Sequence, residues 1–332
     1  MQKMVSAVLV HLSHGMWKKK DADIYESFEE AAWEAILPLL KEYGVDTVLL
    51  DVGDAVEYKS HPEISIKNAW SRERVKKELA RCRDMGITVI PKINFSAGHD
   101  IWLGRYERML STPEYYEVCR DLINEVYEMF EHPAYIHLGM DEEGDEHYYG
   151  NDALVLYRRK NLLFKDLRFL VDTVKETGAT PWLWMDPLFV DTEKYKAEIG
   201  TDALLSPWYY YGLYPEHFKP IEELKEHFLA TYEDFKRLGM TYAEDHPVYV
   251  EFREKILPLA ADAGYAYFPC ASRYFESWNN ADDMVRYFKE GMAEEKLIGF
   301  MTAPWKPMTM QYLETYKENL ADLAAAIKKY YC

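Results

Sequence analysis

The sequence has few cysteines and no long apolar run. Its four cysteines, Cys82, Cys119, Cys270 and Cys332, are widely spaced and form no CxxC pair, which favours reduced thiols over a disulfide framework. No run of about 18 apolar residues occurs, so no membrane-spanning helix is predicted. The N-terminus lacks the basic region and the apolar run of a secretory signal, and we therefore expect a cytoplasmic protein.

Positive charge is also scarce. The chain has 39 Lys and Arg against 57 Asp and Glu, a formal net charge of -18. Such an excess repels phosphate backbones and anionic membranes, and the lysines form no basic stripe. We expect neither a nucleic-acid nor a membrane partner. No cofactor is indicated, and the oligomeric state is not readable from the sequence.

Short apolar segments recur along the chain, and charged segments with helical periodicity follow them. This alternation is typical of βα units in a parallel sheet. Eight such units without a Pro-, Gly- or Ser-rich linker predict an α/β fold, a single (β/α)8 TIM barrel over residues 1–332. A doubly wound sheet is the alternative, because periodicity does not show closure. The segments are residues 6–12, 46–52, 87–93, 135–139, 181–186, 203–208, 265–271 and 298–304, and the longest insertion is expected after the sixth.

The carboxyl ends of the strands build the active site of such a barrel. Acids and large aromatic side chains share these positions here, a combination that suits a sugar, because aromatic rings stack on pyranose faces and carboxylates bind hydroxyls and transfer protons. The candidate residues, in chain order, are His99, Asp141, Glu142, Trp184, Asp186, Trp208, Tyr209, Tyr210, Glu276 and Trp305.

Two pairs at strand ends are interpreted differently. Asp141 and Glu142 follow directly on a segment that should be buried, and Gly139 permits a tight exit from that strand. We expect this pair to be functional. His11 and His14 are interpreted as structural, because HxxH spacing on a strand points the two side chains to opposite faces, which is poor for one metal ion.

The stretch HLGMDE, residues 137–142, resembles the HxGGDE signature of glycoside hydrolase family 20, the β-N-acetylhexosaminidases. FSAGHD, residues 95–100, is similar to the PGH segment of that family, and Trp184, Trp305 and a tyrosine among 209–211 match its pocket aromatics. The sequence departs from the family at Met140, which replaces the second glycine, and at Lys306 and Pro307, where an acid usually follows the tryptophan.

The resemblance implies a specific mechanism. Glu142 would be the general acid and later the base, and Asp141 would hold the 2-acetamido group, whose carbonyl oxygen attacks the anomeric carbon. We expect Asp141, Glu143 and partial burial to raise the pKa of Glu142. No metal and no protein nucleophile are then needed.

Three alternatives remain open at this point. A retaining β-glycosidase would use a strand-four acid and Glu276 as the nucleophile. A metal-dependent sugar isomerase or aldolase would need several ligands that converge on one point. A sugar-binding barrel without catalysis would fit the departure at the eighth strand.

Overall fold

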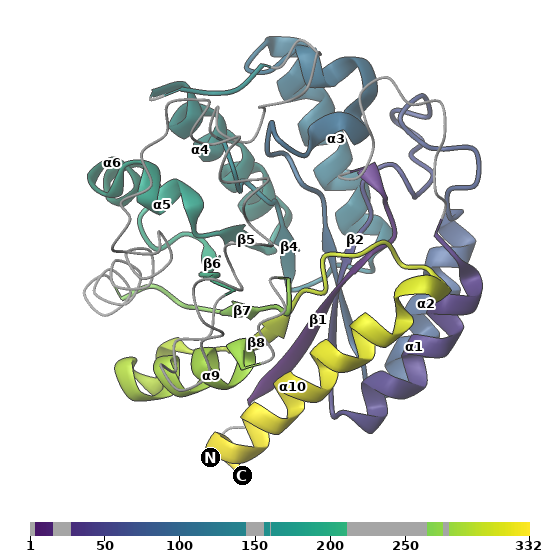
Figure 1. Cartoon of the computed structure of the whole chain (residues 1–332). Coiled ribbons are helices and arrows are strands. Elements are labelled where there is room, and N and C mark those ends of the chain that lie inside the picture. Colours follow the sequence, from purple (N-terminus) through teal and green to yellow (C-terminus); the bar gives the residue numbers. More distant parts are fainter. Residues whose placement is uncertain (1–3, 16–27, 144–155, 160, 211–263, 275–278) are drawn as a thin grey trace, which may run out of the picture.

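The computed structural model describes residues 4–15, 28–143, 156–159, 161–210, 264–274 and 279–332. Eight parallel strands form one sheet in the order β6-β5-β4-β3-β2-β1-β8-β7, with helices around it (Figure 1). Each strand overlaps the segment predicted for it, so the eight predicted strands are confirmed. They are β1 (Val5–His11), β2 (Thr47–Asp51), β3 (Thr88–Lys92), β4 (Tyr135–His137), β5 (Thr180–Trp184), β6 (Leu204–Ser206), β7 (Cys270–Ala271) and β8 (Gly299–Thr302).

The two edges of this sheet meet. Isolated bridges join Leu205 to Tyr267 and Trp208 to Cys270. Around them, the Leu205 amide donates to the Ala266 carbonyl at 3.1 Å, and the Phe268 amide donates to the Leu205 carbonyl at 2.8 Å. The edge strands of a doubly wound sheet do not meet in this way. The predicted (β/α)8 barrel is therefore confirmed.

The helices bury one face each against the outside of the barrel. In α1 (Glu30–Glu42) the buried residues recur every three or four positions, as an amphipathic helix requires. Gly44, with φ 70°, then turns the chain toward β2. Ser71 begins the next helix by accepting a hydrogen bond from the Arg74 amide. The other helices are α2 (Arg72–Asp84), α3 (Pro113–Met129), α4 (Asn161–Thr177), α5 (Asp186–Val190), α6 (Thr192–Glu198), α9 (Asn280–Gly291) and α10 (Leu313–Tyr331).

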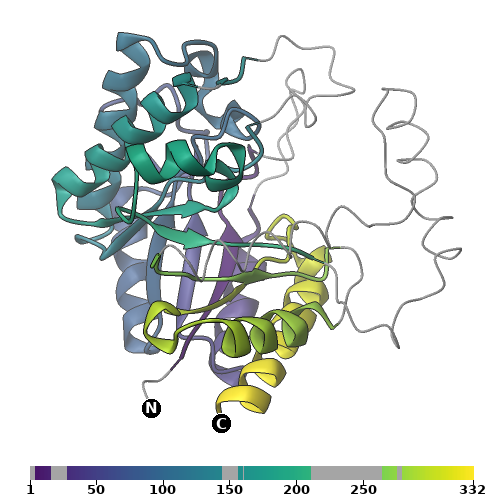
Figure 2. The ribbon, with the colours of Figure 1, turned by 90° about the vertical axis from the view of Figure 1, so that its left-hand side faces the viewer.

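Helices α9 and α10 lie beside each other (Figure 2), α9 against β7 and α10 against β8. The longest connection between consecutive strands follows β6, as predicted from the sequence; residues 211–263 of it lie outside the described residues. Within the described ranges, no helix is both long and apolar enough to cross a bilayer.

Two apolar clusters make up the core. The larger one fills the space between the strands and the surrounding helices. The smaller one fills the barrel itself and includes Leu9, Leu49, Ile90, Trp182 and Phe268. Because side chains alternate along a strand, the next inward positions toward the carboxyl ends lie one layer higher. In the first four strands these positions are polar, and they form the floor of the candidate site.

Candidate active site

The floor consists of His11, Asp51, Lys92 and His137, the last residues of β1 to β4. They are register partners from strand to strand, and all four are buried. Lys92 Nζ donates to Asp51 Oδ2, and His11 Nδ1 lies 3.3 Å from the same oxygen. Burial opposes the Asp51 carboxylate, but the charge of Lys92 and the contact with His11 outweigh it and hold the pKa of Asp51 below its usual value. Burial lowers the pKa of both histidines.

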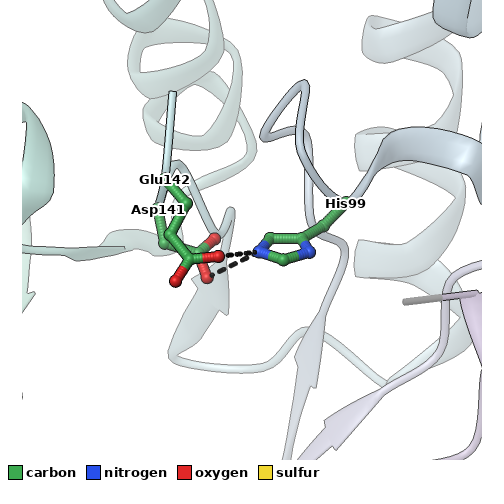
Figure 3. A group of neighbouring side chains, drawn as sticks. All are labelled: His99, Asp141 and Glu142. Carbon is green, nitrogen blue, oxygen red and sulfur yellow. Dashed lines mark hydrogen bonds and ion pairs between the residues drawn. The ribbon is translucent and has the colours of Figure 1, made fainter. Parts of the chain in front are cut away.

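His99, Asp141 and Glu142 meet above this floor (Figure 3). His99 Nε2 lies 2.9 Å from Glu142 Oε2 and 3.4 Å from Asp141 Oδ2. Asp141 also accepts a hydrogen bond of 3.0 Å from Asn94 Nδ2. The Asp141 side chain is 9% exposed and that of Glu142 is 27% exposed. One carboxylate is thus held from two sides, whereas the other remains more accessible.

The imidazole of His99 is positively charged near neutral pH. Burial disfavours the imidazolium, but the charges of Asp141 and Glu142, together with the hydrogen bond to Glu142, outweigh it and raise the pKa of His99 from 6.5 to about 9. His99, on the loop after β3, therefore places a proton donor and a positive charge beside Asp141 and Glu142.

We expect the folded protein to lose stability as pH rises through 9. The pKa of His99 is raised from 6.5 to about 9 on folding, so the stabilisation by its proton is complete below 6.5 and is lost as pH rises through 9. Its size is on the order of 1–3 kcal/mol. Urea unfolding at several pH values measures this loss. His99→Gln should flatten the dependence in this range, and equal slopes for the two proteins would assign it to another group.

The loop after β4 has an unusual backbone. Gly139, Met140 and Glu142 all have positive φ, at 74°, 67° and 53°. At Gly139 no side chain fits, because an added Cβ would lie 1.8 Å from Asn94 Oδ1. Met140, which replaces a glycine of the HxGGDE signature, is fully buried in the larger core cluster. Burial of its side chain compensates for a backbone conformation that costs about 1–2 kcal/mol outside glycine.

Asp186, the first residue of α5, supports Glu142 from the other side. Its Oδ1 accepts a hydrogen bond of 3.2 Å from the Glu142 amide, and its Oδ2 accepts one of 2.8 Å from Trp208 Nε1. Burial, together with the charge of Asp141, raises the pKa of Asp186 to about 7. Asp186 therefore joins the acid pair to the aromatic side of the site.

Four aromatic side chains form this side, which we call the aromatic wall: Trp184, Trp208, Tyr210 and Trp305. Trp208 and Tyr210 stack with ring centroids 5.1 Å apart. Tyr210 lies 6.2 Å from Trp305, and Trp305 lies 5.7 Å from Trp184. Rings in this arrangement can bind the apolar face of a pyranose.

A cavity above the floor reaches Asp141 of the acid pair and Trp305 of the wall. Its lining includes His11, Lys92, His99, Asp141 and Trp305. The structure thus brings together eight residues predicted from the sequence, namely His99, Asp141, Glu142, Trp184, Asp186, Trp208, Tyr210 and Trp305.

Two predicted residues are not part of this group. Tyr209 is 1% exposed, and its hydroxyl donates to Asp283 of α9 at 3.0 Å. Glu276 lies outside the described residues, so its role stays a prediction. The sequence interpretation also did not assign Lys92 and Arg158. Strand alternation from Ile90 places Lys92 inward and could have identified it; no local pattern marks Arg158.

Three side chains could together hold a cation. The ligand atoms of His99, Asp141 and Glu142 lie within 4.8 Å of one another. A metal ion there would bind the neutral imidazole, whereas the two carboxylates by themselves raise the pKa of His99 and favour its charged form. The ion pair between His99 and the two carboxylates is the arrangement that the charges favour.

No protein-family profile matches this sequence, and no curated protein matches it. Solved structures do match. The fold is a (β/α)8 barrel of the kind found in structures of glycoside hydrolase family 20. The distant resemblance read from HLGMDE is therefore confirmed at the level of the fold.

Three of these structures illustrate the match. An exo β-N-acetylglucosaminidase of family 20 from Vibrio harveyi, in complex with N-acetylglucosamine, superposes with a TM-score of 0.59 at 15% identity over 97% of this chain. A β-N-acetylhexosaminidase from Bacteroides fragilis gives 0.56 at 12% identity over 97%, and Dispersin B gives 0.56 at 12% identity over 99%. The match spans 54%, 65% and 99% of those chains, respectively. At these identities the likeness establishes the fold.

Proposed function

We propose that this chain is a glycoside hydrolase that acts on β-linked N-acetylhexosaminides. The main support is the meeting of His99, Asp141 and Glu142 beyond the carboxyl ends of the strands, where Asp186 joins them to the aromatic wall. The substrate would be a glycoside or a small oligosaccharide. The family 20 enzymes that share the fold support the same substrate class.

Glu142 is the general acid in this mechanism. It protonates the glycosidic oxygen while the bond from that oxygen to the anomeric carbon breaks. Its partial exposure gives the substrate access. The hydrogen bond of 2.9 Å from His99 Nε2 to Glu142 Oε2 joins the carboxylate to a protonated imidazole, from which the required proton can pass to Glu142.

Asp141 holds the substrate's 2-acetamido group. Its carboxylate accepts the N–H of that group, and the acetamido carbonyl oxygen then forms a bond to the anomeric carbon as the leaving group departs. Water, deprotonated by Glu142, later opens this cyclic intermediate and gives a product with retained configuration. Asn94 and His99 fix the orientation of Asp141.

The first experiment compares 4-nitrophenyl β-glycosides that differ only at carbon 2. We expect turnover of the N-acetylglucosamine and N-acetylgalactosamine compounds and at least about 10³-fold slower hydrolysis of their 2-hydroxyl counterparts, because only the acetamido group supplies an intramolecular nucleophile. Product anomers followed by NMR should show retention. Equal rates on both classes would contradict the substrate-assisted mechanism.

Two control arms separate the alternatives. If Glu276 is a nucleophile, the 2-hydroxyl sugars are hydrolysed and Glu276→Gln removes that activity. The convergence of His99, Asp141 and Glu142 favours a metal-dependent sugar enzyme as the second candidate. In that case EDTA removes the activity and a divalent cation restores it. The proposed hydrolase is unaffected by EDTA, because none of its steps uses an ion.

A further inference from the structure

Two loops carry the acid pair and its histidine, and their backbones are joined directly. Residues 93–99 follow β3, and residues 138–143 follow β4. The Phe95 amide donates to the Leu138 carbonyl at 3.0 Å, and the Ser96 hydroxyl donates to the Asp141 carbonyl. The pairing of β3 with β4 ends at Lys92 and His137. Beyond it, the relative position of the two loops depends on contacts of this kind.

Glu143 makes a further contact between the two loops. Its side chain is 2% exposed, and its Oε1 accepts a hydrogen bond of 2.8 Å from the Ala97 amide. Ala97 lies two residues before His99, and Glu143 directly follows Glu142. Glu143 therefore ties the loop that carries the imidazole to the loop that carries the acid pair.

Arg158 fixes Glu143 from behind. Its Nη1 donates to Glu143 Oε1 and, at 3.1 Å, to the Phe95 carbonyl. Its Nε donates to Asp166 of α4 at 2.7 Å, and its Nη2 donates to the Tyr115 hydroxyl of α3 at 2.7 Å. The guanidinium is completely buried. One side chain thus anchors both loops to two helices outside the barrel.

We propose that Glu143 and Arg158, which we call the brace, are positioning residues for His99 and Glu142. The inference rests on the proposed hydrolase function and adds residues that do not touch the sugar. Glu142 has φ 53°, a conformation that persists only where surrounding contacts over-determine it. A catalytic group must also stay within about 0.5 Å of its productive position. The brace supplies both constraints.

The test uses two variants of Glu143. Glu143→Ala removes the acceptor for the Ala97 amide, and we expect kcat on the N-acetylglucosamine substrate to fall about 10- to 100-fold with KM changed less than about threefold, because misplacement of the acid affects the transition state more than binding. Glu143→Gln keeps an oxygen for Ala97 and Arg158, and it should restore kcat to within about threefold of wild type.

Tyr116→Phe is the matched control. Its hydroxyl donates to Asp166, so the variant perturbs the same buried network without touching either loop. We expect kcat within about twofold of wild type even if the unfolding midpoint falls. A loss of kcat in Tyr116→Phe equal to that in Glu143→Ala would overturn the proposal, because stability alone would then explain both.

Crystal structures of the variants provide a readout that does not depend on the reaction. In Glu143→Ala the distance from His99 Nε2 to Glu142 Oε2, 2.9 Å in the native protein, should increase by about 1 Å or more, whereas Glu143→Gln should keep it. An unchanged distance in Glu143→Ala would overturn the brace. An increased distance in a protein without activity on acetamido sugars would retain the brace and reject the proposed function.

Discussion

Glu142→Gln is expected to lower kcat for a β-linked N-acetylglucosamine disaccharide by about 10²- to 10⁴-fold, the usual contribution of a positioned acid. The amide has the shape of the carboxyl group and can accept the hydrogen bond from His99. It cannot give a proton to the leaving oxygen. The loss should therefore appear in kcat, with KM nearly unchanged, in steady-state assays of disaccharide hydrolysis.

The leaving group provides an internal check on this assignment. 4-Nitrophenolate departs without protonation. In Glu142→Gln the rate of glycosidic bond cleavage should therefore fall less for the 4-nitrophenyl glycoside than for the disaccharide. Glu57→Gln, at an exposed position of the chain after β2, should behave as wild type on both substrates. An identical loss on both substrates would place the role of Glu142 in water activation or binding and not in acid catalysis.

Arg158→Met is expected to lower the free energy of unfolding by about 3–5 kcal/mol. The guanidinium is 0% exposed and pairs with both Glu143 and Asp166. Methionine fills part of the volume but leaves two buried carboxylates without their cation, and the desolvation cost of these charges is then uncompensated. Denaturant unfolding followed by tryptophan fluorescence measures the change.

Arg159→Met is the control for this prediction. Arg159 is adjacent in the sequence, but its side chain is exposed and contacts Tyr157. Its substitution should change the unfolding free energy by less than about 0.5 kcal/mol. If Arg158→Met changed the free energy of unfolding as little as Arg159→Met, the ion pairs of Arg158 would be hydrated in solution. That result would contradict their burial.

The count of eight apolar segments, each followed by a helical segment, predicted the barrel, whereas periodicity alone left the closure of the sheet open. The seventh strand shows the limit of the method. Residues 265–271 were predicted as one strand, whereas only Cys270 and Ala271 form a regular ladder with β8. Tyr267 makes isolated bridges to Leu205 and Leu297. Regular pairing depends on two neighbours at once, and one segment of sequence contains no information about either.

The site was predictable where residues are close in sequence or belong to a recognisable motif. Asp141, Glu142 and His99 were found in this way. Arg158 was not, because its partners Glu143, Asp166 and Tyr115 come from three different elements. We expected the negative charge of Glu143 to raise the pKa of Glu142. In the structure Arg158 pairs with Glu143 and compensates that charge. The structure places Glu142 beside His99 instead, so the expected rise in its pKa stays a prediction.

The floor of the cavity acts on His99 through charge and not through contact. Lys92 touches neither carboxylate of the acid pair in any described contact, yet its charge lowers the proton affinity of His99 through space. The brace acts on geometry, and the floor acts on the electric potential. Substitutions at these two places are therefore expected to act separately, one on the geometry of the acid pair and the other on the pKa of His99.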